Sequence, residues 1–314
     1  MRKISIIISS LLLILITFTK VNSDEKFSSW IIEFKKKAIN EGISEKTVDA
    51  VMNNAIFLPK VIEYDRYQPE FYEDTKTYVS KRTSKDKVKK GKRIYKKNKN
   101  LINIVDKEFK VEKELLLALM GIETNYGTYL GKMDIISSLA TLSYDKRRSE
   151  FFSNELITIL KLIDQNKVDK DILFGSWAGA FGNFQFMPTT ISNYAIDYNN
   201  NSIIELKDAE DSFASAANYL NKIGWRKNEP CFFNIELNEN IPRKLLNTSA
   251  KKIKHKRKFK YYKKYIREFE NLNIGDNVKV AVITPDSDIV KAVSYTHLRA
   301  HETDSYLVCR LLLE

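Results

Sequence analysis

The spacing of apolar side chains predicts a chain made mostly of helices. In five segments apolar residues recur every three or four positions, which is typical of helices that bury one face. These segments are residues 30–53, 78–99, 101–109, 149–165 and 213–223. Gly42 divides the first segment, so a pair of helices is expected there.

Two segments depart from helical spacing. Residues 58–72 contain Pro59 and Pro69, so we expect an extended connector there. Residues 278–283 read VKVAVI after a Gly-Asp turn, which predicts a strand. The predicted fold class is therefore mainly α, an α+β chain whose small β portion lies near the C-terminal end.

The first 23 residues are predicted to be a signal peptide and not part of the fold. Arg2 and Lys3 precede an apolar run over residues 4–18, and a possible cleavage site follows at residues 21–23. The run is short for a membrane span. No Cys follows it closely, so a lipid anchor is not expected. We therefore expect export.

The net charge of the chain favours an anionic partner. The formal charge is +12, of which Arg2, Lys3 and Lys20 carry three, leaving +9 for the rest. The basic residues concentrate at residues 87–99 and 251–264. For an exported protein we expect an anionic cell-surface polymer or membrane, and no nucleic acid, as the partner. The first run also fits an amphipathic helix, so a solvated helix face is its expected role.

The last 22 residues, 293–314, differ in composition from the body of the chain. They hold two of the three His residues and one of the two Cys residues. His297 and His301 are spaced like zinc ligands, but the segment resembles translated sequencing-adapter read-through, and we do not interpret it as a metal site. The native part of the sequence is expected to be truncated near residue 292, with residues 293–314 a non-native tail. Two cysteines exclude a disulfide scaffold.

One carboxylate closes an otherwise apolar predicted helix within residues 115–131 (LLLALMGIETNYGTYLG). Leu116, Leu119 and Met120 share a helical face with Glu123, and Gly127 is the expected helix stop. The helix dipole and the apolar surroundings both favour the neutral acid, so the pKa of Glu123 is expected to be raised, as a general acid requires. The alternative is a Glu that turns to solvent at a helix end.

Two further segments have more than one interpretation. Residues 175–189 (GSWAGAFGNFQFMPT) alternate small and aromatic residues, which suits either close approach of the backbone to a ligand or a tight packing turn. Arg147 and Arg148 precede a predicted helix. Paired Arg side chains bind carboxylates in a bidentate manner, although exposed pairs are usually solvated.

Residues 197–208 (DYNNNSIIELKD) have the length and oxygen pattern of a calcium-binding EF-hand loop. Ser202 stands where that loop has Gly, and Asp208 stands where it has Glu. We expect a weak Ca²⁺ site that tolerates Na⁺, a loop that keeps the shape without the ion, or an Asn-rich turn. The candidate ligands are Asp197, Asn199, Asn201, Asp208 and the carbonyl of Ile203, with Glu205 at position nine.

Several of these motifs occur together in the order of a known family. GIETNYG, ATLSYDKRRSEFF, GSWAGAFGNFQFMPT, the twelve-residue loop and ANYLNKIGW resemble the lytic murein transglycosylase B family, as does DRYQPEF at residues 65–71. The resemblance runs from near Trp30 to about Trp225. It implies a helical N-terminal domain (residues 24–100) and a lysozyme-like α core with a small β portion (residues 101–292).

The resemblance also implies site residues. Glu123 matches the single catalytic acid/base of the family. The matches to substrate-binding residues are Ser176 and Gln185 in the saccharide cleft, the pair Arg147 and Arg148, and the aromatic residues Tyr219 and Tyr78.

The activity that the resemblance implies is cleavage of the β-1,4 bond between N-acetylmuramic acid and N-acetylglucosamine, with formation of a 1,6-anhydro ring. No cofactor is required. A hydrolytic muramidase and a non-catalytic peptidoglycan-binding protein are the alternatives. The expected setting is a monomer in the periplasm of a Gram-negative envelope, acting on peptidoglycan glycan strands and in contact with cell-wall synthesis proteins.

Overall fold

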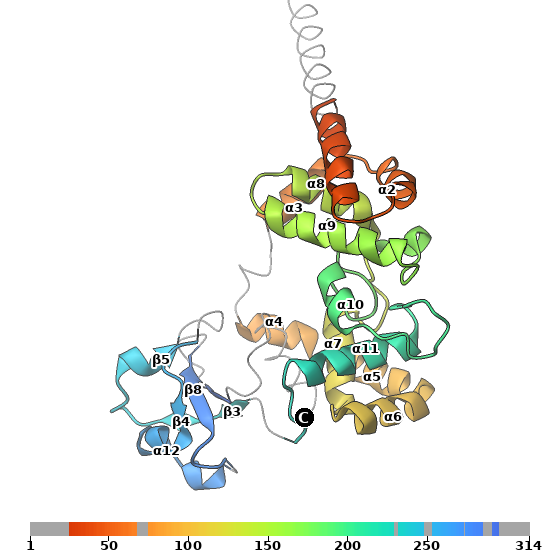
Figure 1. The fold of residues 1–314 in the computed structure, drawn as a ribbon. Coiled ribbons are helices and arrows are strands. Elements are labelled where there is room, and N and C mark those ends of the chain that lie inside the picture. The colour runs from red at the N-terminus through yellow and green to blue at the C-terminus, as the bar shows by residue number, and fades with distance from the viewer. Residues whose placement is uncertain are drawn as a thin grey trace, which may run out of the picture. The chain divides into compact units, whose positions relative to one another are not determined.

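The structure is a computed structural model that describes residues 25–67, 75–228, 232–247, 253–272, 274–284 and 291–294. The chain forms two compact units, coloured along the chain in Figure 1. Unit 1 takes residues 1–67, 131–181 and 186–193, and unit 2 takes residues 68–130, 182–185 and 194–314. The predicted signal peptide and residues 295–314 of the predicted non-native tail lie outside the described residues, so both stay predictions.

Unit 1 is built from helices around an aromatic cluster. A helix over residues 25–40 ends before Gly42, whose φ is +87°, and α2 (Glu45–Met52) follows, as the sequence predicted. The other elements are α3 (Pro59–Arg66), β1 (Met133–Asp134), α8 (Ile135–Tyr144), α9 (Ser149–Asp164), β2 (Phe174–Gly175) and α10 (Pro188–Tyr194). The ring centroids of Phe27, Trp30, Phe34, Phe57 and Tyr144 lie 5.0–6.0 Å apart in the contacts between them.

The prediction of an extended connector was wrong over α3. Pro59 occupies the first turn of this helix, where the missing N–H costs nothing because that position has no intrahelical acceptor. Val61 and Asp65, four residues apart, are both buried and give the helix an inner face. The chain becomes extended at Tyr67 (φ −128°, ψ 105°), just before the described residues stop.

α8 and α9 form the central helix pair of unit 1. In α9 the predicted apolar face is buried, including Phe152, Leu156 and Ile159, whereas Phe151 is 48% exposed. In α8 every residue from 135 to 143 is buried. Its hydroxyls bind a neighbouring segment: the Ile56 N–H donates to Ser137 Oγ (3.1 Å) and the Leu58 N–H to Thr141 Oγ1 (3.0 Å). α8 therefore anchors the chain that leads into α3.

The helices of unit 2 are α4 (Thr75–Arg82), α5 (Lys85–Lys97), α6 (Lys99–Phe109), α7 (Lys113–Thr124) and α11 (Ala209–Lys222). The helix predicted over residues 78–99 is divided in two, because Ser84 caps α5 and accepts a hydrogen bond from the Lys87 N–H. Ile102 and Val105 are buried as predicted. The predicted domain boundary after residue 100 falls inside α6 and within this unit.

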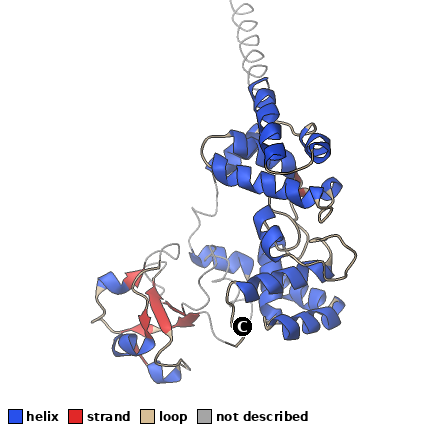
Figure 2. Ribbon diagram, in the orientation of Figure 1, coloured by secondary structure: helices blue, strands red, loops and turns tan. Residues whose placement is uncertain are grey.

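The remaining described part of unit 2, residues 232–294, is called the β module here, and its strands are red in Figure 2. One sheet has the order β3 (Phe232–Asn234), β9 (Lys291–Ser294), β8 (Lys279–Ile283) and β5 (Leu246–Asn247), with β6 (Arg257–Lys258) also paired to β8. A second sheet pairs β4 (Glu236–Leu237) with β7 (Ile266–Arg267). α12 (Phe259–Tyr262) supplies Phe259 and Tyr262 to a core that also contains Val280 and Val282. The strand predicted over residues 278–283 is confirmed as β8.

Within the described residues, no helix combines the length and the apolar composition that crossing a bilayer requires.

Candidate active site

Glu123 lies in the last turn of α7 and its side chain is half-buried. The helix ends at Thr124, before the predicted stop at Gly127, because Asn125 (φ 49°) and Tyr126 (φ 59°) adopt left-handed conformations. The buried Thr124 hydroxyl donates to the Asn183 carbonyl (2.9 Å) and accepts from the Gly127 N–H (2.9 Å). These contacts hold the turn that follows Glu123 in one position.

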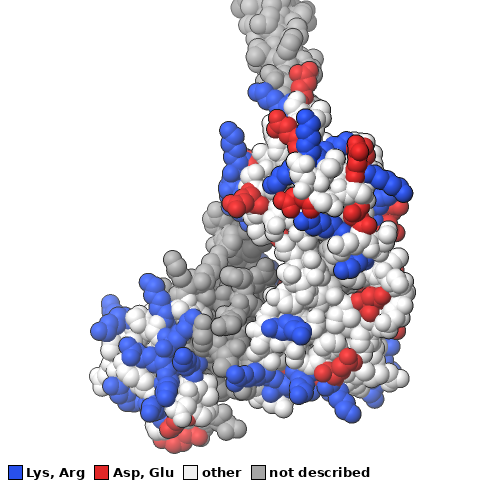
Figure 3. All heavy atoms as spheres, viewed as in Figure 1, with Lys and Arg blue, Asp and Glu red and all other residues white. Residues whose placement is uncertain are grey.

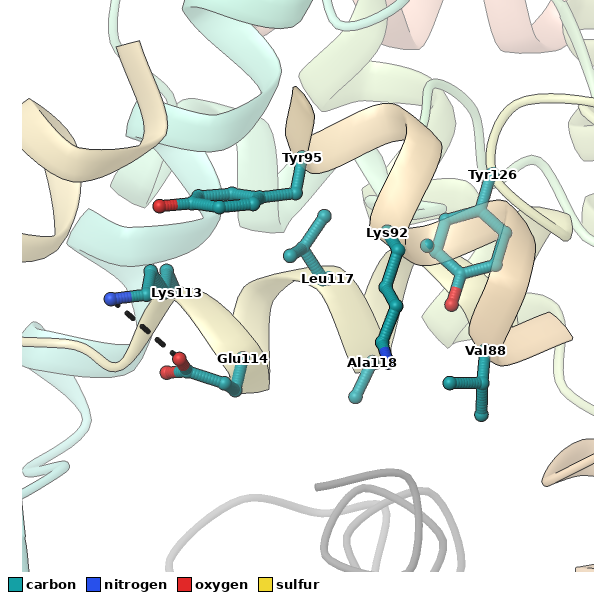
Figure 4. A pocket seen from close by; sticks show the side chains of 9 residues that line it. Val88, Lys92, Tyr95, Lys113, Glu114, Leu117, Ala118 and Tyr126 are labelled. Atoms are coloured by element: carbon teal, nitrogen blue, oxygen red, sulfur yellow. Dashed lines mark ion pairs between the residues drawn. The ribbon is translucent and has the colours of Figure 1, made fainter. Parts of the chain in front are cut away.

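Tyr126 is wedged between two helices at the places where each lacks a side chain. A Cβ at Gly91 of α5 would lie 2.5 Å from the Tyr126 hydroxyl oxygen, and one at Gly121 of α7 would lie 2.7 Å from its ring. The Tyr126 side chain lines a pocket of about 250 Å³ between α5 and α7 (Figure 4). Burial raises the pKa of the Tyr126 phenol. Both glycines are therefore needed for this packing.

Two lysines of the first basic run bind carbonyl groups at the end of α7. The Lys90 ammonium donates to the Asn125 carbonyl (2.7 Å) and also contacts the Thr128 hydroxyl, and the Lys87 Nζ lies 3.5 Å from the Gly121 carbonyl oxygen. Burial, followed by the charges of Arg82 and Lys90, lowers the pKa of Lys87. Positive charge at this end offsets the helix dipole. The helix dipole therefore no longer supports a raised pKa of Glu123. The raised pKa stays a prediction, and it rests on the half-buried position of this side chain.

Gln185 lies in the same unit as Glu123 and braces the loop that follows it. Its side-chain amide donates to the carbonyl of Leu130 (3.3 Å) and to that of Gly182 (3.0 Å), and its backbone is left-handed (φ 50°). Together with the bond from Thr124 to Asn183, this brings residues 182–185 against the turn after α7.

Ser176, in unit 1, closes a tight turn. Its hydroxyl oxygen accepts from the Ala180 N–H (3.0 Å), and its own N–H donates to the Ala180 carbonyl (2.8 Å). A Cβ at Gly179 would lie 2.4 Å from Leu139, and one at Gly182 would lie 2.4 Å from Leu206. The sequence left two interpretations of residues 175–189: close approach of the backbone to a ligand, or a tight packing turn. The contacts at Gly179 and Gly182 favour the packing turn.

Arg147 and Arg148, also in unit 1, converge on Asp65, which is 2% exposed. Arg147 Nη1 donates to the Asp65 carbonyl oxygen (2.7 Å) and lies 3.2 Å from its Oδ2, while Arg148 pairs with Oδ1. The Arg148 guanidinium also lies over the Phe152 ring, 4.7 Å from its centroid. Their side chains keep 47% and 38% exposure, so part of each guanidinium remains open to a ligand.

The two aromatic candidates lie in unit 2. The half-buried Tyr219 ring packs edge-on against Tyr194, with 5.1 Å between centroids. Tyr78 is placed in α4, and its side chain lies outside the described part of the structure.

Comparisons with known proteins connect these features to one family. The family profile described as a transglycosylase SLT domain matches residues 26–298. The chain belongs to the transglycosylase SLT domain family. The resemblance to lytic murein transglycosylase B is thereby confirmed, and so is the mainly α fold with a small β portion.

Individual relatives agree with the family match. The chain is 36% identical to membrane-bound lytic murein transglycosylase B of Escherichia coli (strain K12) over 153 residues, which are 48% of this chain and 42% of that protein. The aligned region thus spans less than half the length of this relative. SltB3 from Pseudomonas aeruginosa, solved in complex with NAG-NAM-pentapeptide, is 26% identical with a TM-score of 0.82, and the match covers 91% of this chain and 78% of that chain.

A third relative agrees with the fold. The Escherichia coli lytic transglycosylase Slt35 in complex with calcium is 24% identical with a TM-score of 0.74, and the match covers 90% of this chain and 91% of that chain. At this identity the likeness establishes the fold.

In this transglycosylase SLT domain, residues 197–208 form a tight loop in which side chains of the loop accept backbone hydrogen bonds. Ser202 adopts φ +75° at the position where an EF-hand loop has Gly. Asp197 accepts from the N–H groups of Asn201 (3.0 Å) and Ser202 (2.7 Å), and Asn201 accepts from that of Ile203 (2.9 Å). Asp208 makes no side-chain cap to α11. Among the residues described, no group of three His, Cys, Asp or Glu side chains suited to a metal was found.

The sequence interpretation missed two buried carboxylates that organise this domain. Asp211, fully buried in α11, accepts from the N–H groups of Tyr198 (2.8 Å) and Glu205 (2.8 Å) and so shapes the loop. Glu155 of α9 accepts from the Thr189 N–H (2.8 Å) at the start of α10. A carboxylate at an otherwise apolar helical position was the available signal for Glu155, since ionised side chains are seldom buried without partners.

Proposed function

We propose that this chain is a lytic transglycosylase that cleaves the β-1,4 bond between N-acetylmuramic acid and N-acetylglucosamine in peptidoglycan. The observation that carries the proposal is the placement of Glu123. It lies half-buried at the end of α7, in a turn held by Thr124, Asn183 and Lys90, within the region that matches the family. The murein and NAG-NAM names of the relatives support this substrate class.

In the proposed reaction Glu123 acts first as acid and then as base. Its proton passes to the glycosidic oxygen as the bond from that oxygen to the anomeric carbon of the muramyl residue breaks. The muramyl N-acetyl group stabilises the cationic carbon. The 6-hydroxyl of the same sugar then attacks this carbon and returns its proton to the Glu123 carboxylate. A 1,6-anhydro ring forms and no water is consumed, which distinguishes this route from ordinary glycoside hydrolysis.

The remaining predicted residues are proposed to hold the glycan strand and its peptide. The residues proposed to contact the saccharide are Ser176, Gln185, Tyr219 and Tyr78. The open parts of Arg147 and Arg148 suit the carboxylates of the peptide, because guanidinium groups bind carboxylates in a fixed geometry.

The first prediction concerns Glu123→Gln. This substitution replaces a carboxylic acid by an amide, which removes the transferable proton and preserves the shape of the side chain. Turnover should therefore fall by about 10²–10⁴-fold, with binding to sacculi unchanged. The measurement is digestion of purified peptidoglycan, with mass spectrometry of the released muropeptides. Glu114→Gln is the matched control, because it removes a half-exposed carboxylate from the first turn of the same helix.

Each outcome of this digestion has a meaning. Anhydro ends from the unchanged chain and none from Glu123→Gln would support the proposal. Reducing ends would assign a hydrolytic muramidase, and binding of sacculi without release would assign a wall-binding protein. Retained turnover in Glu123→Gln would remove this residue from the mechanism.

We further propose that residues 197–208 bind Ca²⁺ weakly, through Asp197, Asn199, Asn201, Asp208 and the Ile203 carbonyl. The left-handed backbone of Ser202 supports the proposal. It is the conformation that lets an EF-hand loop turn sharply and bring its ligands together around one ion. The side-chain ligands, with Glu205, carry a formal charge of only −3. Bound Ca²⁺ would neutralise these carboxylates and hold the loop before α11.

The second prediction is therefore a small stabilisation by calcium. With a dissociation constant near 10⁻³ M, ten times that concentration should stabilise the fold by about 1.4 kcal/mol and raise Tm by about 2–4 °C. Differential scanning fluorimetry with Ca²⁺, with Na⁺ and with chelator measures this. The shift should vanish in Asp197→Asn and persist in Asp169→Asn, a carboxylate of unit 1. Equal shifts in both variants would contradict the site.

The cellular setting is also a proposal. We propose an exported monomer that acts in the periplasm of a Gram-negative envelope. The wall substrate supports this setting, because peptidoglycan lies outside the inner membrane.

A further inference from the structure

The second basic run forms a strongly charged surface on the β module. Residues 254–267 contain eight Lys or Arg residues and no Asp or Glu. Seven of the eight are exposed: Lys254, Lys256, Arg257, Lys258, Lys260, Lys264 and Arg267. Figure 3 shows a concentration of blue over the visible face of the β module, and the red seen on that face lies along its lower edge.

Part of this run shares one surface around two tyrosines. The Arg257 guanidinium lies 4.5 Å and the Lys264 ammonium 5.4 Å from the Tyr261 ring centroid. Lys264 also lies 4.8 Å from the Tyr265 ring, and the two tyrosine centroids are 6.2 Å apart. We call Arg257, Lys260, Tyr261, Lys264 and Tyr265 the basic face, in which Lys260 is the exposed neighbour of Tyr261 along the chain.

Internal ion pairing does not account for the basic face. Within the described part of the chain, Lys263 pairs with Asp276 (2.5 Å), whereas Arg257, Lys260 and Lys264 make no ion pair. Like charges held this close repel one another, so an external anion would relieve the repulsion. The first basic run differs, because Lys87 and Lys90 bind carbonyls at the end of α7.

A general excess of lysine in the chain does not account for it either. Residues 25–67 contain seven Lys or Arg and seven Asp or Glu, while the described residues of the β module contain twelve and five. The two colours are accordingly mixed over the helices of residues 25–67 in Figure 3. The positive charge is therefore a local property of the β module.

The tyrosines distinguish between anionic partners. Nucleobases bind by stacking on open aromatic faces. The faces of Tyr261 and Tyr265 are instead occupied by Arg257 and Lys264, and both rings are half-buried. Half-buried tyrosines flanked by long cationic side chains suit a lipid headgroup layer, where the rings sit at the polar boundary and the cations reach phosphate oxygens.

We propose that the basic face binds the phosphate groups of anionic phospholipids and holds the β module at a membrane surface. Cations within the Debye length of such a surface each strengthen binding about fivefold, and salt weakens the effect. The contact is peripheral, because it needs surface charge and no spanning helix. It is independent of the proposed activity.

The test is sedimentation of the full chain with phosphatidylcholine vesicles that either contain or lack phosphatidylglycerol. We expect binding only to the anionic vesicles, and less of it at high salt. The triple variant Arg257→Gln, Lys260→Gln, Lys264→Gln should bind roughly hundredfold more weakly. The matched control is Lys36→Gln, Lys37→Gln, Lys46→Gln, which removes the same charge from exposed positions of unit 1.

Three results would overturn the proposal. The first is equal binding to neutral and anionic vesicles. The second is an equal loss of vesicle binding in the triple variant and in its control. The third is salt-sensitive binding to DNA or to sacculi that is stronger than vesicle binding and is lost in the triple variant. Circular dichroism and peptidoglycan digestion by both variants show whether the fold is intact. If the triple variant unfolds, Lys260→Gln with Lys264→Gln replaces it, with an expected loss of about 25-fold.

Discussion

Asp65 receives both guanidinium groups of the Arg147–Arg148 pair. It is 2% exposed, so water does not solvate its carboxylate if the arginines leave. The sequence indicated that the paired arginines bind a carboxylate. In the structure they bind the carboxylate of Asp65, while part of each arginine side chain stays exposed. The identity of this carboxylate was not predictable, because Asp65 lies about eighty residues earlier in a segment that the prolines marked as extended.

The third prediction is that Asp65→Asn destabilises the fold by about 2–3 kcal/mol, because it removes charge-assisted bonds to a buried group. Urea unfolding followed by circular dichroism measures the free energy of unfolding. Asp171→Asn is the control: this carboxylate pairs with Lys170 and its side chain is 75% exposed, so less than about 1 kcal/mol should be lost. Similar losses of unfolding free energy in the two variants would show that the bonds from Asp65 to the two arginines stabilise the fold no more than an exposed ion pair does.

At the scale of elements, helices with one apolar face were predictable and wholly buried helices were not. α9 and α11 follow the periodicity of their apolar residues. α8 was missed because residues 135–143 are buried on every side, which leaves no alternation to detect. The end of α7 was located to within three residues, but its left-handed Asn125 and Tyr126 depend on tertiary packing against Gly91 and Gly121.

The fourth prediction concerns that packing. Gly121→Ala would place a Cβ 2.7 Å from the Tyr126 ring, so the fold should lose about 1–3 kcal/mol and the turn after Glu123 should shift, lowering peptidoglycan turnover. Gly275→Ala is the control, because its nearest neighbour, Val278, would lie 3.7 Å away, and a change within about 0.5 kcal/mol is expected.

A double-mutant cycle separates this clash from helix propensity. Tyr126→Leu shortens the side chain that Gly121→Ala would strike, so the double variant should be more stable than the sum of the two single losses implies. Additive losses would show that the two positions are not coupled. Alanine also favours a helix more than glycine, so any propensity effect acts in the opposite direction to the expected loss.

For the whole molecule, the sequence indicated the class of fold but not how the chain is divided into two units. The β module was represented by one predicted strand, β8, because most of its other strands span only two residues and carry no periodicity. Its stability depends instead on a compact core in which Tyr262 is fully buried and donates to the His255 carbonyl (2.5 Å). Burial raises the pKa of Tyr262 to about 12.

The fifth prediction follows from that pKa. The raised value means that the fold favours the neutral phenol, so this contribution is complete below pH 10 and is lost as the pH rises towards 12. The free energy of unfolding should fall by about 1.4 kcal/mol per pH unit more steeply than in Tyr262→Phe over that interval. Denaturant titrations of both proteins between pH 8 and about 12 measure the difference. Parallel curves would contradict the assignment.

The interleaving of the two units has a consequence for the order in which the molecule is made. Unit 1 is assembled from three stretches that end at residue 193, and unit 2 begins between the first and second of them. The ribosome must therefore synthesise residues 186–193 before unit 1 has all its parts, and by then helices α4, α5, α6 and α7 of unit 2 have already been synthesised. We expect unit 1 of the nascent chain to remain sensitive to protease until that length, and unit 2, which still lacks the residues from 194 onward, to acquire resistance only at greater chain lengths.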